Sequence, residues 1–181
     1  MSYDISLIDR NTKHSLKMNT PQFITGGTIP AEIDPTTGKL VHAKQISTEI
    51  NITYNYSNYY YEIYKNGIRE LYGKTAKESI DMLNHMIKSI LNKYKVNDEW
   101  IISERTSKEL YDEDGNKIKD PIGAILHNIK YTTKEIKYTI SEGDTSDYWE
   151  ATAANAITPL YSMLHMAVEH VDNTDAVWDG D

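Results

Sequence analysis

Residues 75–94 have the sequence TAKESIDMLNHMIKSILNKY, and this stretch predicts a single amphipathic helix. Thr75 and Glu78 have the spacing of a capping box, in which the hydroxyl and the carboxylate each accept a hydrogen bond from a backbone N–H that lacks a helical partner. Apolar side chains then recur every three or four residues, as on a buried helix face: Ile80, Leu83, Ile87, Ile90, Leu91 and Tyr94. We therefore expect a helix over residues 76–94.

A second helix is expected over residues 147–170, because apolar residues recur there with the same spacing. Pro159 interrupts the pattern, since proline has no N–H to donate within a helix. Two alternatives follow: Thr158 caps a new helix with Pro159 in its first turn, or a single helix kinks at the proline. Residues 172–181 have the composition of an acidic tail with one tryptophan.

The strands are predicted from shorter patterns. Residues 3–9 and 46–56 alternate between apolar and polar side chains, as expected of strands with one buried face. Asp34-Pro35-Thr36-Thr37-Gly38 is a strong turn signal, so residues 39–43 are expected to return as the second strand of a hairpin. For the tyrosine-rich residues 57–64 a short helix is preferred, and a continued strand is the alternative.

These elements predict an α+β fold, with an antiparallel sheet and two main helices packed on one of its faces. Residues 1–96 and 143–181 are expected to form a single core. Residues 97–142 are predicted to be a polar, β-hairpin-rich insertion with two local hairpins, over residues 108–118 and 124–140. The insertion has little apolar content of its own, so we expect it to need support from the core or from a partner.

The composition excludes several kinds of chemistry. The chain has 181 residues and no cysteine, so disulfides, thiolate metal sites and cysteine nucleophiles are absent. It contains no phosphate-binding glycine loop, serine-nucleophile motif or metal-type histidine spacing, and we expect a non-enzymatic protein without metal or cofactor. It also has no apolar signal segment or run of membrane-spanning length, which favours the cytoplasm and disfavours a membrane partner.

The net charge of −8 is unevenly distributed. Residues 1–90 contain 9 acidic and 10 basic side chains, residues 91–181 contain 18 and 9, and no lysine or arginine follows Lys137. Direct binding to nucleic acid is disfavoured for the second half, because contacts to phosphate need cations. We assign the excess acid to the insertion and to the stretch after it. A basic protein surface is the expected partner, with nucleic-acid mimicry as one use, and a merely solvated surface is the alternative.

The residues expected to contact such a partner are Asp112, Glu113, Asp114, Glu142, Asp144, Asp147 and Trp178. A tryptophan among acids either packs back onto the protein or is reserved for a partner.

Tyrosine supplies the second candidate site. The chain contains 14 tyrosines and a single phenylalanine, and the tyrosines gather at residues 54–64. Ring faces, amides and a guanidinium suit a stacked base or sugar with a phosphate beside the arginine. The alternative is that this segment simply packs on the main helix. The residues expected to hold a ligand are Asn51, Tyr54, Asn55, Tyr60, Arg69, Tyr72, Trp149 and Asn155.

Four blocks of the sequence, in this order, resemble a family of small accessory proteins encoded by tailed phages and prophages. They are NITYNY at residues 51–56, GIRELYGKT at 67–75, DYWEAT at 147–152 followed by Asn155-Ala156, and VWDGD at 177–181. The chain departs from the family pattern by apparent insertions around residues 30–46 and 97–142.

The resemblance implies three hypotheses about function. The first is a stoichiometric antagonist of bacterial antiphage defence, binding a defence protein or its CRISPR-type effector complex through the acidic half. The second is a sponge that sequesters a nucleotide immune signal in the tyrosine-rich site. The third is a phage metabolic or structural accessory without a defence role. All three place the protein in the cytoplasm of the host bacterium, and its oligomeric state stays open.

Overall fold

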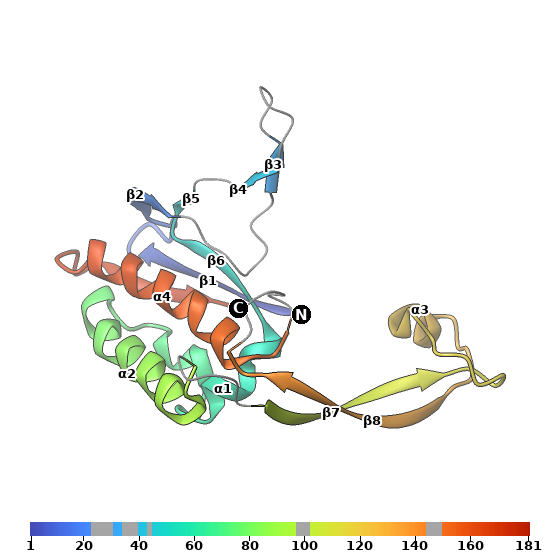
Figure 1. Cartoon of the computed structure of the whole chain (residues 1–181). Helices are drawn as coiled ribbons and strands as arrows, with labels where there is room; N and C mark the ends of the chain where they lie inside the picture. Colours follow the sequence, from blue (N-terminus) through green and yellow to red (C-terminus); the bar gives the residue numbers. More distant parts are fainter. Residues whose placement is uncertain (23–30, 34–39, 43–44, 97–101, 144–149) are drawn as a thin grey trace. The chain divides into compact units, whose positions relative to one another are not determined.

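The computed structural model describes residues 1–22, 31–33, 40–42, 45–96, 102–143 and 150–181. The chain divides into two compact units (Figure 1). Met1–Ile101 and Glu142–Asp181 form the first, which we call the body, and Ile102–Ser141 form the second, which we call the hairpin unit. The fold is α+β, as the sequence predicts.

A three-stranded antiparallel sheet forms the centre of the body. Its strands are β1 (Ser2–Asp9), β6 (Glu49–Thr53) and β9 (Ala176–Gly180), in the order β6-β1-β9. Directly paired residues lie on the same face, and alternate residues of a strand point to opposite faces. One face therefore carries six large apolar side chains, all of them buried: Tyr3, Ile5, Leu7, Ile50, Ile52 and Trp178.

Helices α2 (Ala76–Tyr94) and α4 (Ala153–Glu169) pack against this apolar face (Figure 1). The capping box predicted at the start of α2 is present, and the helix has the predicted bounds. Helix α4 runs through Pro159 as one helix, and its N-cap is Thr152, so the alternative of a new helix capped by Thr158 is wrong.

The tyrosine-rich segment is helical, and the alternative of a continued strand is wrong. Strand β6 ends at Thr53, three residues earlier than predicted, because the Thr53 side chain accepts a hydrogen bond from the N–H of Asn55. A short 3-10 turn (Tyr54–Tyr56), helix α1 (Ser57–Tyr61) and a second 3-10 turn (Gly67–Leu71) follow.

The expected acidic tail is instead an edge strand. In β9, Trp178 donates its N–H to Lys74 O (3.0 Å) and its carbonyl accepts from Gly73 N–H (2.8 Å). The same residue pairs with Leu7 on the other side of the strand. The strand is therefore held by backbone bonds on both sides, which no local pattern among these acidic residues indicates.

Two small antiparallel pairs complete the body. Strand β2 (Lys17–Gln22) pairs with β5 (Gln45–Ser47), and β3 (Ala31–Ile33) pairs with β4 (Leu40–His42). Strand β4 lies within the predicted returning strand, and the turn predicted before it lies outside the described residues.

The hairpin unit contains one long hairpin rather than two local ones. Strands β7 (Ile102–Tyr111) and β8 (Thr132–Ser141) pair over their whole length, from Ile102 opposite Ser141 to Tyr111 opposite Thr132. The first predicted turn does form at residues 112–116. A strand is predicted over residues 124–131, but residues 124–126 belong to helix α3 (Pro121–Leu126), because Asp120 and Pro121 supply a helix start, and residues 127–131 form no strand.

Candidate interaction site

The described residues of the predicted ligand set do not surround an open pocket. Tyr60 is fully buried, and its hydroxyl donates to the main-chain oxygen of Ala156 (2.8 Å). Burial raises the pKa of this phenol well above its ordinary value. Asn155 is also buried, and its amide donates to the Glu150 carbonyl (3.2 Å). The expectation that these two side chains reach a ligand is corrected: Tyr60 joins α1 to α4, and Asn155 bonds to the backbone just before α4.

Three predicted ligand residues, Tyr54, Arg69 and Tyr72, do lie together. The Arg69 guanidinium donates to the Tyr54 hydroxyl (3.1 Å) and to the main-chain oxygen of Asp181 (3.3 Å). It also lies 4.8 Å from the ring centroid of Tyr3, within the range of a cation–π interaction. The Tyr72 hydroxyl donates to the same Asp181 oxygen (3.1 Å), and burial is the main cause that raises the pKa of Tyr72 to about 12.

The arginine predicted to bind a phosphate thus already contacts two rings and a carbonyl of the protein. Asn51 lies on the polar face of the sheet, where its amide donates to Ser2 Oγ (2.7 Å) and to the Asp4 carboxylate. Asn55 is exposed at the 3-10 turn. Trp149 lies outside the described residues.

A first prediction tests the structural role of Tyr60. Tyr60→Phe is expected to lower the free energy of unfolding by about 0.5–1.5 kcal/mol, because a buried hydrogen bond is lost while the ring stays. Tyr161→Phe is the matched control, since that ring is half exposed, and its change is expected to be negligible. Chemical denaturation measures both; equal stability of Tyr60→Phe and the wild type would contradict the placement.

Two residues of the predicted partner set belong to the core. Trp178 is 1% exposed, and the Glu142 side chain is fully buried. Glu142 Oε2 accepts from the N–H of Ala153 (2.9 Å) and lies 2.6 Å from the Tyr59 hydroxyl, so this carboxylate caps the N-terminus of α4. The expectation that these two side chains face a partner is corrected. Asp144 and Asp147 lie outside the described residues.

The remaining partner residues, Asp112, Glu113 and Asp114, lie in the turn that follows β7. Asp112 closes this turn by accepting from the N–H of Asn116 (2.8 Å). The hairpin unit as a whole is not acidic, because its seven acidic side chains are matched by seven basic ones. The predicted insertion, residues 97–142, does carry an excess of acid, with ten acidic and seven basic side chains, but this excess comes from Asp98, Glu99 and Glu142, which lie outside the hairpin unit. Residues 142–181 carry nine acidic side chains and no basic one.

The hairpin unit differs from the body in its apolar surface. Among the side chains that the structure describes, ten large apolar ones are exposed, and six of them belong to the hairpin unit. Five of these lie on α3 and the residues after it, which we call the apolar tip: Ile122, Ile125, Leu126, Ile129 and Tyr131. Ile122 is 72% exposed and Leu126 73%.

The apolar tip was not predicted from the sequence. A signal was present, because Asp120-Pro121 followed by apolar residues at positions 122, 125, 126 and 129 has helical spacing. The spacing does not tell which way the apolar side chains face, and only the structure shows that they lie in solvent.

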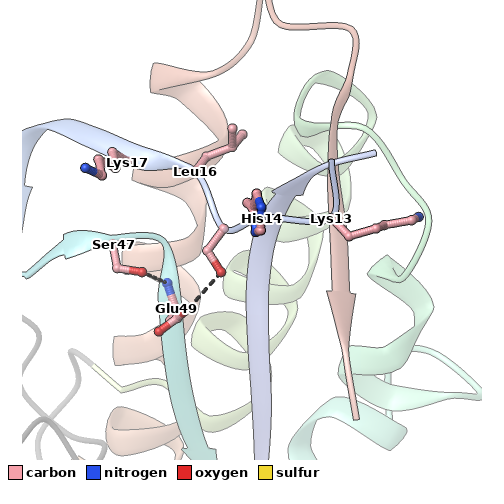
Figure 2. A pocket seen from close by; sticks show the side chains of 7 residues that line it. Lys13, His14, Leu16, Lys17, Ser47 and Glu49 are labelled. Atoms are coloured by element: carbon pink, nitrogen blue, oxygen red, sulfur yellow. Dashed lines mark hydrogen bonds between the residues drawn. The ribbon is translucent and has the colours of Figure 1, made fainter. Parts of the chain in front are cut away.

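The body contains an open hollow of about 570 Å³ beside the turn between β1 and β2 (Figure 2). Figure 2 shows its two lysines, Lys13 and Lys17, pointing to opposite sides, so they do not converge on one ligand. Glu49 accepts from Ser15 Oγ (2.8 Å) on its wall. Within the described ranges, no group of three or more histidine, aspartate or glutamate side chains is arranged to hold a metal ion.

Comparison with known proteins yields no relative: no family model, curated protein or solved structure matches this chain. In the described part of the chain, no helix combines the length and the apolar character needed to cross a membrane.

Proposed function

We propose that this protein is a non-enzymatic, stoichiometric binder of another protein, and that it acts as a phage-encoded antagonist of bacterial antiphage defence. Its partner in this proposal is a defence protein or the effector complex of a CRISPR-type system, met in the host cytoplasm. The biological role follows from the resemblance of the four sequence blocks, and the mode of action follows from the geometry of the hairpin unit.

The apolar tip is the observation that carries the proposal. Large apolar side chains gathered on one exposed element mark protein–protein interfaces, whereas isolated ones are ordinary. Complete burial of one such side chain contributes about 1.5–3 kcal/mol. Because Ile122 and Leu126 are each nearly three-quarters exposed, a partner that covers them gains most of that amount.

The acidic turn after β7 adds a second contact in the same unit. Asp112, Glu113 and Asp114 are three consecutive acids, and Glu113 and Asp114 are exposed. Rim charges of this kind chiefly speed association and select partners by charge. Glu113 is already paired with the Lys130 ammonium (3.4 Å), so the support that this turn gives to a basic partner surface comes chiefly from Asp114. Glu142 and Trp178 no longer belong to that expected surface.

The nucleotide-sponge hypothesis has less support. Arg69, which that hypothesis assigns to a phosphate, contacts Tyr54, Tyr3 and Asp181 of the protein itself. A ligand at this place would have to displace those contacts, and that cost opposes binding.

Removal of the hairpin unit is the direct test of the proposed function. Ile102 and Ser141 are paired across the hairpin, so residues 103–140 can be replaced by a Gly-Ser-Gly loop without separating the ends. We expect the body to keep its far-ultraviolet circular dichroism and its cooperative unfolding. On defended hosts, the full chain should raise the efficiency of phage plating, and the loop variant should plate no better than phage without the protein.

The controls separate the three hypotheses. Plating on undefended hosts should not change. Full rescue by the loop variant would contradict binding through the hairpin unit, and absence of rescue by the wild type across a panel of defended hosts would favour the metabolic or structural accessory. A thermal shift with cyclic nucleotides would favour the sponge.

A further inference from the structure

We propose that Arg69, Tyr72 and the backbone of Asp4 form a recognition site for an extended Gly-Asp segment, and that residues 180–181 of the chain itself occupy this site. In the isolated protein the site is therefore closed by an autoinhibitory contact. It opens to a segment of the same chemistry on a partner protein once residues 180–181 leave. The inference goes beyond the proposed function, because the site belongs to the body and not to the hairpin unit.

Asp181 is held by donors from three separate parts of the body. Its main-chain oxygen accepts from Arg69 Nη2 (3.3 Å) and from the Tyr72 hydroxyl (3.1 Å). Its carboxylate Oδ1 accepts from the N–H of Asp4 in β1 (3.0 Å), and its own N–H donates to Asp4 O (3.3 Å). The site thus combines the backbone bonds of an added strand with a charge-assisted hydrogen bond to the acidic residue.

The arginine has other partners in the body that hold it in place without the segment. Its guanidinium donates to the Tyr54 hydroxyl (3.1 Å) and lies 4.8 Å from the ring centroid of Tyr3. A planar guanidinium stacked on an aromatic ring is fixed before a ligand arrives, which lowers the entropic cost of binding. We therefore expect the donor set to persist when residues 180–181 leave.

The segment approaches the body so closely that position 180 has to be glycine. A Cβ at Gly180 would lie 2.5 Å from Asp4 O and 2.6 Å from the Tyr72 hydroxyl oxygen. Neither atom moves away without loss of a bond in the site, because Asp4 O accepts from Asp181 and the Tyr72 hydroxyl donates to it. The site therefore accepts an acidic residue only when glycine precedes it.

The occupying segment can leave without opening the core. The first three residues of β9, 176–178, are buried, whereas residues 179–181 are exposed. Trp178 also keeps its backbone bonds to Gly73 and Lys74. Release of residues 180–181 therefore breaks hydrogen bonds at the surface and leaves the buried anchors of β9 in place. Segments held in this way open at a low cost in free energy.

An external segment has to compete with the chain's own segment. A segment tethered beside its site has an effective concentration of about millimolar or above, so a free segment that makes the same contacts is outcompeted. A partner protein overcomes this disadvantage by making further contacts outside the site, whereas a second copy of the chain brings only the same segment. We therefore assign the external segment to a partner protein that exposes a Gly-Asp sequence.

Gly180→Ala tests the inference, because the added methyl group expels residues 180–181 and opens the site to a free peptide. The probe is acetyl-Asp-Gly-Asp, which copies residues 179–181, and the nuclear magnetic resonance signals of the Asp4 amide and the Arg69 side chain report its binding. We expect the variant to bind this peptide about tenfold or more tightly than the wild type, since self-occupancy lowers the apparent affinity. Acetyl-Asp-Ala-Asp should bind about tenfold or more weakly than the glycine peptide, because its Cβ meets the same atoms.

Matched variants separate the site from general effects of charge and folding. Arg69→Gln in the Gly180→Ala background should abolish binding of the peptide, whereas Lys65→Gln, which removes another exposed cation of the body, should not change it. A variant that lacks Gly180 and Asp181 repeats the test without the added methyl group. Circular dichroism and tryptophan fluorescence check that both opened variants stay folded.

Four results would overturn the inference. Failure of both folded, opened variants to bind the peptide would remove the site, and equal binding by the wild type would remove the autoinhibitory contact. Binding of sodium acetate as strong as that of the peptide would indicate an anion site without peptide recognition. A complex of the wild type with the variant lacking Gly180 and Asp181 in sedimentation would assign the segment to a second copy. These measurements leave the hairpin unit unchanged, so their failure is distinguishable from failure of the proposed function.

Discussion

Trp178→Ala is expected to lower the free energy of unfolding by about 3–5 kcal/mol, the usual cost of deleting a large aromatic side chain from a core. Trp178 is 1% exposed and lies on the apolar face of the central sheet, against α2. Because whole domains are stable by only about 5–15 kcal/mol, this single change removes a large share of the total. Urea denaturation of the purified variant measures it.

A hydrogen bond adds to the packing of this ring. The indole Nε1 donates to Ser79 Oγ (2.8 Å), and Ser79 Oγ in turn donates to Ala76 O (2.7 Å) in the first turn of α2. Trp178→Phe keeps much of the ring volume but loses the donor, so it should cost less than Trp178→Ala. Asp179→Ala is the matched control on the same strand, since Asp179 is exposed, and a change within about 0.5 kcal/mol is expected. A loss below about 1 kcal/mol for Trp178→Ala would show that the C-terminal strand does not pack as described.

Glu142→Ala is expected to cost about 2–3 kcal/mol, because it leaves a buried backbone N–H of α4 without an acceptor. Three successive donors at the start of this helix depend on Glu142 and Thr152: Ala153 N–H on Glu142 Oε2, Ala154 N–H on Glu142 O, and Asn155 N–H on Thr152 Oγ1. The substitution removes the side-chain acceptor and the negative charge that the helix N-terminus favours.

The variants around Glu142 separate capping from charge. Glu142→Gln keeps an oxygen that can accept from Ala153, so it should lose less stability than Glu142→Ala. The Tyr59 hydroxyl retains the Ala151 oxygen as a partner in either variant, at 2.5 Å. Glu150→Ala is the control because that side chain is exposed, and thermal unfolding compares all three. Equal stability of Glu142→Ala and Glu150→Ala would refute the capping role.

Neighbouring elements differ in how completely the sequence predicts them. Helix α2 was predicted to the residue, since its capping box and its apolar repeat both lie within twenty residues of sequence. The prediction of a short helix at α1 is confirmed, whereas the sequence does not distinguish core from pocket for the tyrosines around it. Whether a tyrosine belongs to the core or to a site depends on the groups that contact it. The Tyr60 hydroxyl donates to the main-chain oxygen of Ala156 in α4, whereas the Tyr54 hydroxyl accepts from Arg69.

The candidate site was harder to predict than the fold. Three acidic residues of the predicted partner set, Asp112, Glu113 and Asp114, do lie on the hairpin unit, but Glu142 is buried under α4. A carboxylate is equally suited to a partner's cation and to a helix N-terminus, and its own residue type does not distinguish the two. The apolar tip was missed for the complementary reason, because apolar spacing predicts a helix and not its exposure.

By itself, the sequence determined the α+β class, the bounds of α2, the helical character of residues 57–61 and the absence of thiol chemistry. These depend on local spacing, on capping side chains and on composition. Only the tertiary structure decided that β9 closes the sheet, that β7 and β8 form one hairpin, and that Trp178 and Glu142 are core residues while Ile122 and Leu126 are surface residues. The strand pairings and the burial of Trp178 depend on partners distant in sequence, such as Leu7 for Trp178 and Ser141 for Ile102, and long-range pairing leaves no periodic pattern along the chain.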